Sequence, residues 1–341
     1  MDRECCLEVA AEGAFQLARE REDVMSVFVC GSMAKEPPPA YADVDLRVVI
    51  EADQAEASYY EVKRGVPLEW VFVPKRRFDS REELLNASFL APELVNGVII
   101  YDPMGWLGQV RDEIRSVYGH PSYRIARSQR LLDAARSLYE GIRKRFGAGE
   151  AASLWDMRRA IFWAGETPSL LLNDIPNHRR LMVGLKDVGA RLNAPELHPM
   201  GIETIGATRV ERSEVETFFI NSLDSITYIN SVSEPHHFHL SLDKRDYWEH
   251  GITQMLADGY HREAVWPILT LMSAIHPILV SVDTESDHKG RPYRHYLRCR
   301  HFWERLGFLS KDNFQQKLVK LDEFIGKADQ LIARQRLNSL S

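Results

Sequence analysis

The spacing of apolar residues changes once along this chain of 341 residues, and that change limits the classes of fold open to it. Residues 5–20 place apolar side chains at helical spacing. Short β-rich runs follow, most of them ended by a glycine or proline signal, as strands commonly are. These runs are 26–30, 45–50, 68–73 and 97–101. The first third therefore predicts an α+β domain, a mixed sheet with flanking helices.

Beyond a turn-like stretch at 118–121 the signal becomes mainly helical. Apolar side chains recur at steps of three and four residues over 131–142. Further helical stretches are 153–172, 215–230, 262–280 and 313–335. We therefore predict two domains, an α+β domain over 1–118 and an α-helical domain over 119–341.

Charge and cysteine content narrow the class of protein. Acidic residues outnumber basic ones, 49 to 43, for a formal net charge of −6. General phosphate-backbone binders usually carry a basic excess, so we do not expect nucleic acid as a partner, although a local basic groove fits this balance. The N-terminus lacks a secretory layout, and we expect no apolar run near the ~18 residues of a membrane span. Cys5, Cys6, Cys30 and Cys299 form no CxxC pair, which favours reduced thiols in the cytoplasm.

Three acidic residues stand where a sheet could bring them together. Asp43 and Asp45 lie at the head of the second β run, and residues i and i+2 of a strand point to the same face. Glu69 interrupts the otherwise apolar third run and joins them if the two strands are neighbours. Clustered carboxylates repel one another unless cations lie between them, and oxygen ligands of this kind suit Mg²⁺. Two such ions stabilise the attacking and leaving oxygens of a phosphoryl displacement.

Gly31 and Ser32, directly after the first β run, fit the same chemistry. A glycine turn lets backbone N–H groups and a hydroxyl approach a phosphate closely. Lys35, three residues after the serine, would add positive charge for a triphosphate. A Gly-Ser pair, an Asp-x-Asp pair or an acidic residue in a strand is more often structural when it occurs alone. Their ordered combination favours a metal site.

Residues 28–32, 43–45 and 68–71 together resemble the motifs of the nucleotidyltransferase superfamily that includes DNA polymerase β. Within it they are most similar to the kanamycin (aminoglycoside 4′) nucleotidyltransferases. The resemblance implies a Mg²⁺-dependent enzyme that moves a nucleoside monophosphate from a nucleoside triphosphate, expected to be ATP, to a hydroxyl of a small molecule such as an aminoglycoside-like antibiotic. Pyrophosphate is released.

The same resemblance implies roles for the parts of the chain. The domain over 1–118 would carry the nucleotidyltransferase site, and the domain over 119–341 would bind the acceptor and contribute to a homodimer. Metal binding falls to Asp43, Asp45 and Glu69, and phosphate binding to the Gly-Ser turn and Lys35.

Residues 138–144 resemble the family helix that carries the catalytic base. The match implies that Glu140 is the base for the acceptor hydroxyl and that Lys144 contacts the triphosphate. The two side chains lie one turn apart and share a face, a spacing that ordinary surface pairs also have. The resemblance is good over 26–73, thin over 95–180, and ends near 190. Transfer to a protein or RNA acceptor therefore stays open, as does nucleotide sensing without turnover.

Histidines and basic spots elsewhere carry weaker signals. His236, His237, His239 and His250 have no nearby cysteine and no helical H-x₃-H spacing, so we expect surface or packing roles rather than a zinc site. The aromatic residues at 155, 162 and 163 are expected to lie in the core. The basic run at 75–77 is expected to be a solvated face, with a triphosphate contact as the alternative. The basic spots at 158–159 and 178–180 have too few interleaved aromatics to indicate RNA binding.

Overall fold

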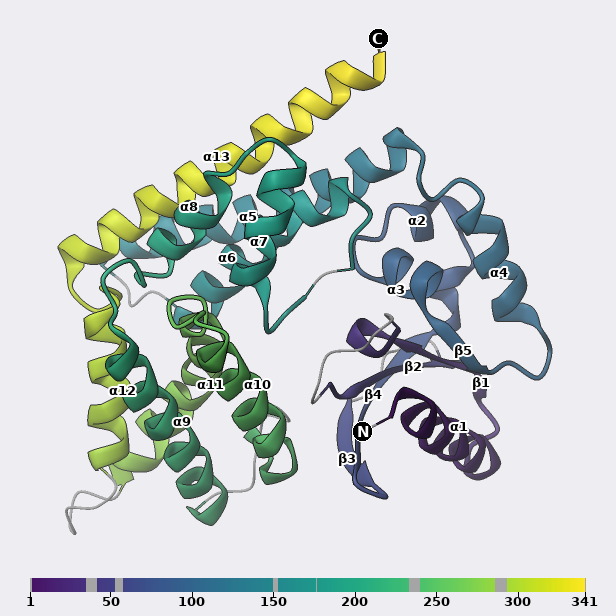
Figure 1. The fold of residues 1–341 in the computed structure, drawn as a ribbon, viewed down its shortest axis with the longest axis horizontal. Coiled ribbons are helices and arrows are strands. Elements are labelled where there is room, and N and C mark those ends of the chain that lie inside the picture. The colour runs from purple at the N-terminus through teal and green to yellow at the C-terminus, as the bar shows by residue number, and fades with distance from the viewer. Residues whose placement is uncertain are drawn as a thin grey trace. The chain divides into compact units, whose positions relative to one another are not determined.

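The computed structural model describes residues 2–34, 42–52, 58–149, 153–175, 177–232, 240–285 and 293–340. The chain folds into two compact units, each with its own packing (Figure 1). The first unit comprises Met1–Arg130 with Leu170–Asn177, and the second comprises Leu131–Ser169 with His178–Ser341. The division of work between 1–118 and 119–341 stays a prediction.

The first unit is built on a mixed five-stranded sheet with the order β3-β4-β2-β1-β5. The strands are β1 (Val24–Cys30), β2 (Val44–Ile50), β3 (Tyr59–Lys63), β4 (Val66–Pro74) and β5 (Val98–Tyr101). β2 and β4 are parallel, and the other neighbouring pairs are antiparallel. The four predicted β runs correspond to β1, β2, β4 and β5, so the expected mixed sheet is confirmed; β3 was not expected.

Helices cover both faces of this sheet because the strands alternate two sets of side chains. Val44, Leu46 and Val48 of β2 are buried in one core cluster with α1 (Arg3–Glu20). On the other face, Phe28 and Val49 pack in a second cluster. The helices of that cluster are α2 (Arg81–Leu85), α3 (Leu90–Asn96) and α4 (Trp106–Arg115). The odd-numbered side chains of β2 therefore point to the face that carries α3.

The rest of the chain is helical, as expected. Its helices are α5 (Pro121–Gly147), α6 (Leu154–Leu171), α7 (Leu181–Arg191), α8 (Leu197–Thr204), α9 (Arg212–Val232), α10 (Arg245–Ala257), α11 (Val265–Glu285), α12 (Tyr293–Arg305) and α13 (Lys311–Leu340). Among the described residues, the second unit contains no strand.

Helix α11 corrects one expectation from the sequence. Its 18-residue window Val265–Val282 has a mean hydropathy of 1.8, long and apolar enough by composition to cross a membrane. The sequence prediction that no run approaches this length was therefore wrong. In the structure 67% of the window is buried, as in the core helices of soluble proteins, which pass the same test of composition.

Candidate metal centre

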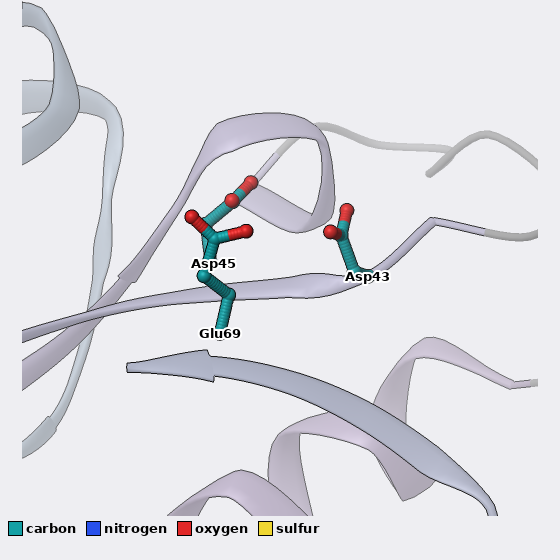
Figure 2. Close-up of side chains that lie close together, drawn as sticks. All are labelled: Asp43, Asp45 and Glu69. Carbon is teal, nitrogen blue, oxygen red and sulfur yellow. The ribbon is translucent and has the colours of Figure 1, made fainter. Parts of the chain in front are cut away.

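The parallel pairing of β2 and β4 brings the predicted carboxylates together. Asp45 lies directly opposite Glu69 in the register, and Val44 opposite Leu68. Neighbouring strands lie about 4.8 Å apart, so register partners present their side chains side by side on one face. Asp43 comes one residue before β2 begins. It is two residues before Asp45, so the two side chains point to the same face. Figure 2 shows the three carboxylates pointing to the same side of the two strands.

The three side chains form a group that can hold a metal ion. One carboxylate oxygen from each of Asp43, Asp45 and Glu69 lies within 4.8 Å of the other two. Asp43 is buried, at 4% exposure, while Asp45 and Glu69 are half-buried. Negative charges this close repel one another, and a divalent cation among them removes that repulsion. An all-oxygen donor set without cysteine or histidine suits a hard cation such as Mg²⁺.

Gly31 is required by the position of Asp45. It follows β1, whose last residue, Cys30, pairs with Asp45 in the register. The backbone of Gly31 has a φ of +64°, and a Cβ built there would lie 1.9 Å from Oδ2 of Asp45. Only glycine lets the backbone come this close to the carboxylate. The short 3₁₀ turn Gly31–Ala34 begins here and places the half-buried Ser32 next in the chain.

A half-buried ion pair supports β2 on the face of the carboxylates. Arg47 lies two residues after Asp45, on the same face, and reaches Glu93 of α3. Its Nε donates to Oε2 of Glu93 at 2.9 Å and its Nη2 donates to Oε1 at 2.6 Å, a bidentate geometry. This pair was not predicted from the sequence, although the alternation of β2 already places Arg47 on the face of Asp45.

Replacing Glu93 by Gln should lower the free energy of unfolding by about 1–3 kcal/mol, because the half-buried Arg47 then lacks its carboxylate. Urea denaturation followed by circular dichroism measures this loss. Glu12→Gln is the matched control, since it breaks the exposed pair between Glu12 and Arg64 and should cost less than about 1 kcal/mol. Equal losses in the two variants would contradict a structural role for the pair between Arg47 and Glu93.

The remaining predicted residues belong to the second unit or lie outside the described chain. Lys35 and the histidines 236, 237 and 239 lie outside the described residues. Glu140 is exposed on α5 and pairs with Arg143 of the same helix at 2.8 Å, and Lys144 is exposed one turn further on. Both belong to the second unit, and their roles stay predictions. His250 is exposed, and its Nδ1 lies 2.8 Å from the backbone oxygen of Asp246 in the same helix, α10.

The second unit contains a pocket of about 810 Å³. Its lining is mainly apolar and aromatic and comes from α5, α6, α11 and α13, with Trp155 and Phe314 among its rings. Burial lowers the pKa of His276 in the wall, so that ring is neutral near pH 7. Lys311 is the charged side chain of the described lining, which includes no carboxylate. A polycationic acceptor needs carboxylates, so this pocket gives no support to an aminoglycoside.

Comparisons with known proteins give a distant likeness. No family model and no curated protein matches the chain. A solved structure of a nucleotidyltransferase-like protein from Exiguobacterium sibiricum is similar to it at 10% sequence identity and a TM-score of 0.32. The likeness covers 90% of this chain and 91% of that one. At this TM-score the likeness carries no argument, and the case for function depends on the geometry of Asp43, Asp45 and Glu69.

Proposed function

We propose that this chain is a divalent-metal-dependent nucleotidyltransferase. The observation that carries the proposal is the convergence of Asp43, Asp45 and Glu69 on one face of the sheet, with Gly31 against Asp45. Asp43 and Glu69 are 26 positions apart in the sequence, and the parallel pairing of β2 and β4 brings them together. Three carboxylates within 4.8 Å of one another repel, and a divalent cation among them would relieve that repulsion.

The chemistry follows from what each group offers. Asp43, Asp45 and Glu69 would hold Mg²⁺, which when bound supplies charge stabilisation at phosphate oxygens. The backbone of Gly31 and the hydroxyl of Ser32 would donate hydrogen bonds to the triphosphate, with Lys35 as an additional cation. The acceptor oxygen attacks the α-phosphorus, the bond from that phosphorus to the bridging oxygen breaks, and pyrophosphate leaves. The proton of the acceptor hydroxyl passes to a base, for which Glu140 is the candidate.

The test of this function is transfer of label. Wild-type protein is incubated with Mg²⁺, α-labelled nucleoside triphosphates and a panel of hydroxyl acceptors that includes aminoglycosides. Label on an acceptor together with released pyrophosphate supports the enzyme, and ATP is the nucleotide we expect to serve best. Binding of nucleotide without release of pyrophosphate under any of these conditions would favour the sensing alternative instead.

The acceptor is proposed to be a small molecule with a free hydroxyl, in a protein that works in the cytoplasm as a homodimer. An aminoglycoside-like antibiotic is the specific candidate, and it rests on the motif resemblance. A protein or RNA acceptor is the second version of the same chemistry. Label recovered on macromolecules in a cell extract would select it, and salt-sensitive retention would separate RNA from protein.

Replacing Glu140 by Gln should lower kcat by about 10² to 10⁴-fold if this side chain removes the proton, with little change in KM for the nucleotide. Steady-state kinetics with the identified acceptor measures the effect. Glu304→Gln is the matched control, because Glu304 forms a similar exposed pair with Arg300 in the second unit. A wild-type kcat in Glu140→Gln would contradict a role for Glu140 as the base and leave it only its surface pair with Arg143.

A further inference from the structure

Two neighbouring arginines on α6 carry positive charge that the described chain does not neutralise. Arg158 is 8% exposed, and its Nε donates to Oγ1 of Thr270 at 3.2 Å. Its two terminal nitrogens have no hydrogen-bond acceptor among the described residues. Neither nitrogen is among the unpartnered polar atoms that are fully buried, so both keep some contact with solvent. The half-buried Arg159 lies over the ring of Trp163 at 4.6 Å. Neither arginine forms an ion pair with a carboxylate of the described chain.

The acidic residues nearest along α6 do not neutralise Arg158 or Arg159. Asp156 is paired with Arg145 at 2.6 Å, and Glu166 lies about two turns beyond Arg158. Burial and the charge of Arg159 together lower the pKa of Arg158 to about 10, which still leaves it protonated at neutral pH. A buried charge without a partner is costly, and proteins rarely keep one without a use for it.

Aromatic rings surround the guanidinium of Arg158. Its Cζ lies 4.9 Å from the ring centroid of Trp155, 5.9 Å from that of Phe162 and 5.7 Å from that of Trp266. Rings at these distances hold a planar cation by cation–π attraction and leave its N–H edge free for a ligand. The guanidinium is thus fixed in position before any ligand arrives, as a preorganised site requires.

We propose that Arg158 forms a binding site for a compact anion of the phosphate type, such as the phosphate end of a small molecule, and that Arg159 strengthens it by its charge. A guanidinium presents parallel N–H donors that match phosphate oxygens, and the charge of the adjacent Arg159 adds attraction for a doubly charged phosphate monoester. Because Arg158 is only 8% exposed, we expect it to take a terminal phosphate rather than a phosphodiester flanked by nucleotides on both sides. The site lies within the second unit and does not depend on the metal centre.

The test measures stabilisation by inorganic phosphate. Thermal unfolding is followed with EDTA present, at constant ionic strength set by NaCl, with Asp45→Asn run in parallel to exclude phosphate bound at the carboxylates. Phosphate at about 100 times its Kd should raise the Tm of both proteins by on the order of 5 °C. Acetate, a single charge, should give a smaller shift.

Variants at Arg158 decide the assignment. Arg158→Met should abolish the phosphate-dependent shift while its Tm without phosphate stays equal to or above that of wild type, because an unpaired buried charge is gone. Arg212→Met removes an arginine that is exposed and paired with Glu216 at 2.8 Å, and should keep the full shift. If Arg158→Met does not fold, Arg158→Lys takes its place and should weaken phosphate binding at least tenfold, since it loses the forked donors.

Three results would overturn the proposal. The first is a phosphate shift no larger than that of NaCl in the wild type. The second is an equal phosphate shift in the wild type and the Arg158 variants. The third is Arg158-dependent binding of a single-stranded oligonucleotide that phosphate does not displace, which would replace the compact anion with a nucleic acid.

Discussion

Replacing Asp45 by Asn is expected to lower nucleotidyl transfer about a thousandfold and to leave the metal-free protein at least as stable as the wild type. The loss of activity follows because Asp45 is one of the three carboxylates of the cluster, and removing its charge would weaken the binding of a cation there. Stability is kept because, without metal, the substitution removes one of three mutually repelling charges. Pyrophosphate release and thermal unfolding in EDTA measure the two effects.

The matched control for this variant is Glu51→Gln. Glu51 follows β2 at the end opposite the carboxylates and is exposed. The substitution makes the same exchange of carboxylate for amide, so it should leave both activity and Tm unchanged. A drop in the stability of Asp45→Asn with activity preserved would show that Asp45 is a structural carboxylate.

Replacing Gly31 by Ala is expected to destroy activity as well, and to cost stability. The added Cβ would lie 1.9 Å from Oδ2 of Asp45 in a backbone with φ of +64°, so the carboxylate, the turn or both must move. The left-handed backbone alone costs alanine roughly 1–2 kcal/mol. We expect a stability loss above that range and an activity loss of at least about a hundredfold, since displaced ligands hold a metal poorly. Urea denaturation and pyrophosphate release are the measurements.

Gly65 supplies the control that separates strain from displacement. It has a φ of +77°, and a Cβ built there meets nothing within 4 Å. Gly65→Ala should therefore carry the conformational cost alone and keep wild-type activity. Full activity in Gly31→Ala would contradict the close approach of this turn to Asp45.

The parts of the fold that local pattern specifies could be predicted from the sequence. The β1, β2, β4 and β5 runs are apolar and bounded by turn signals, and helical periodicity marks the second unit. The pairing of β2 with β4 could only be assumed from the sequence, because local sequence patterns do not determine which strands are neighbours. The structure supplies that pairing, and with it the contact between Asp45 and Glu69.

The elements that were missed depend on tertiary context. Strand β3 joins β4 through a hairpin turn at Arg64 and Gly65, both of which have positive φ. Turns of this kind usually have the sequence Asn-Gly, so Arg-Gly did not indicate a hairpin. The α11 window resembles a membrane span in composition, and only packing identifies it as a core helix. One of the three rings around Arg158 belongs to Trp266, 108 residues further along the chain, so the sequence could not show this contact.

The most direct test measures whether the three carboxylates hold a divalent cation with a triphosphate. Mn²⁺ is titrated into the protein with a non-hydrolysable ATP analogue, and free Mn²⁺ is followed by electron paramagnetic resonance. Wild type and Glu51→Gln should bind Mn²⁺ beyond what the analogue binds alone, and Asp45→Asn should bind it at least tenfold more weakly. Equal Mn²⁺ binding by wild type and Asp45→Asn, or none by the wild type, would contradict a metal centre at Asp43, Asp45 and Glu69.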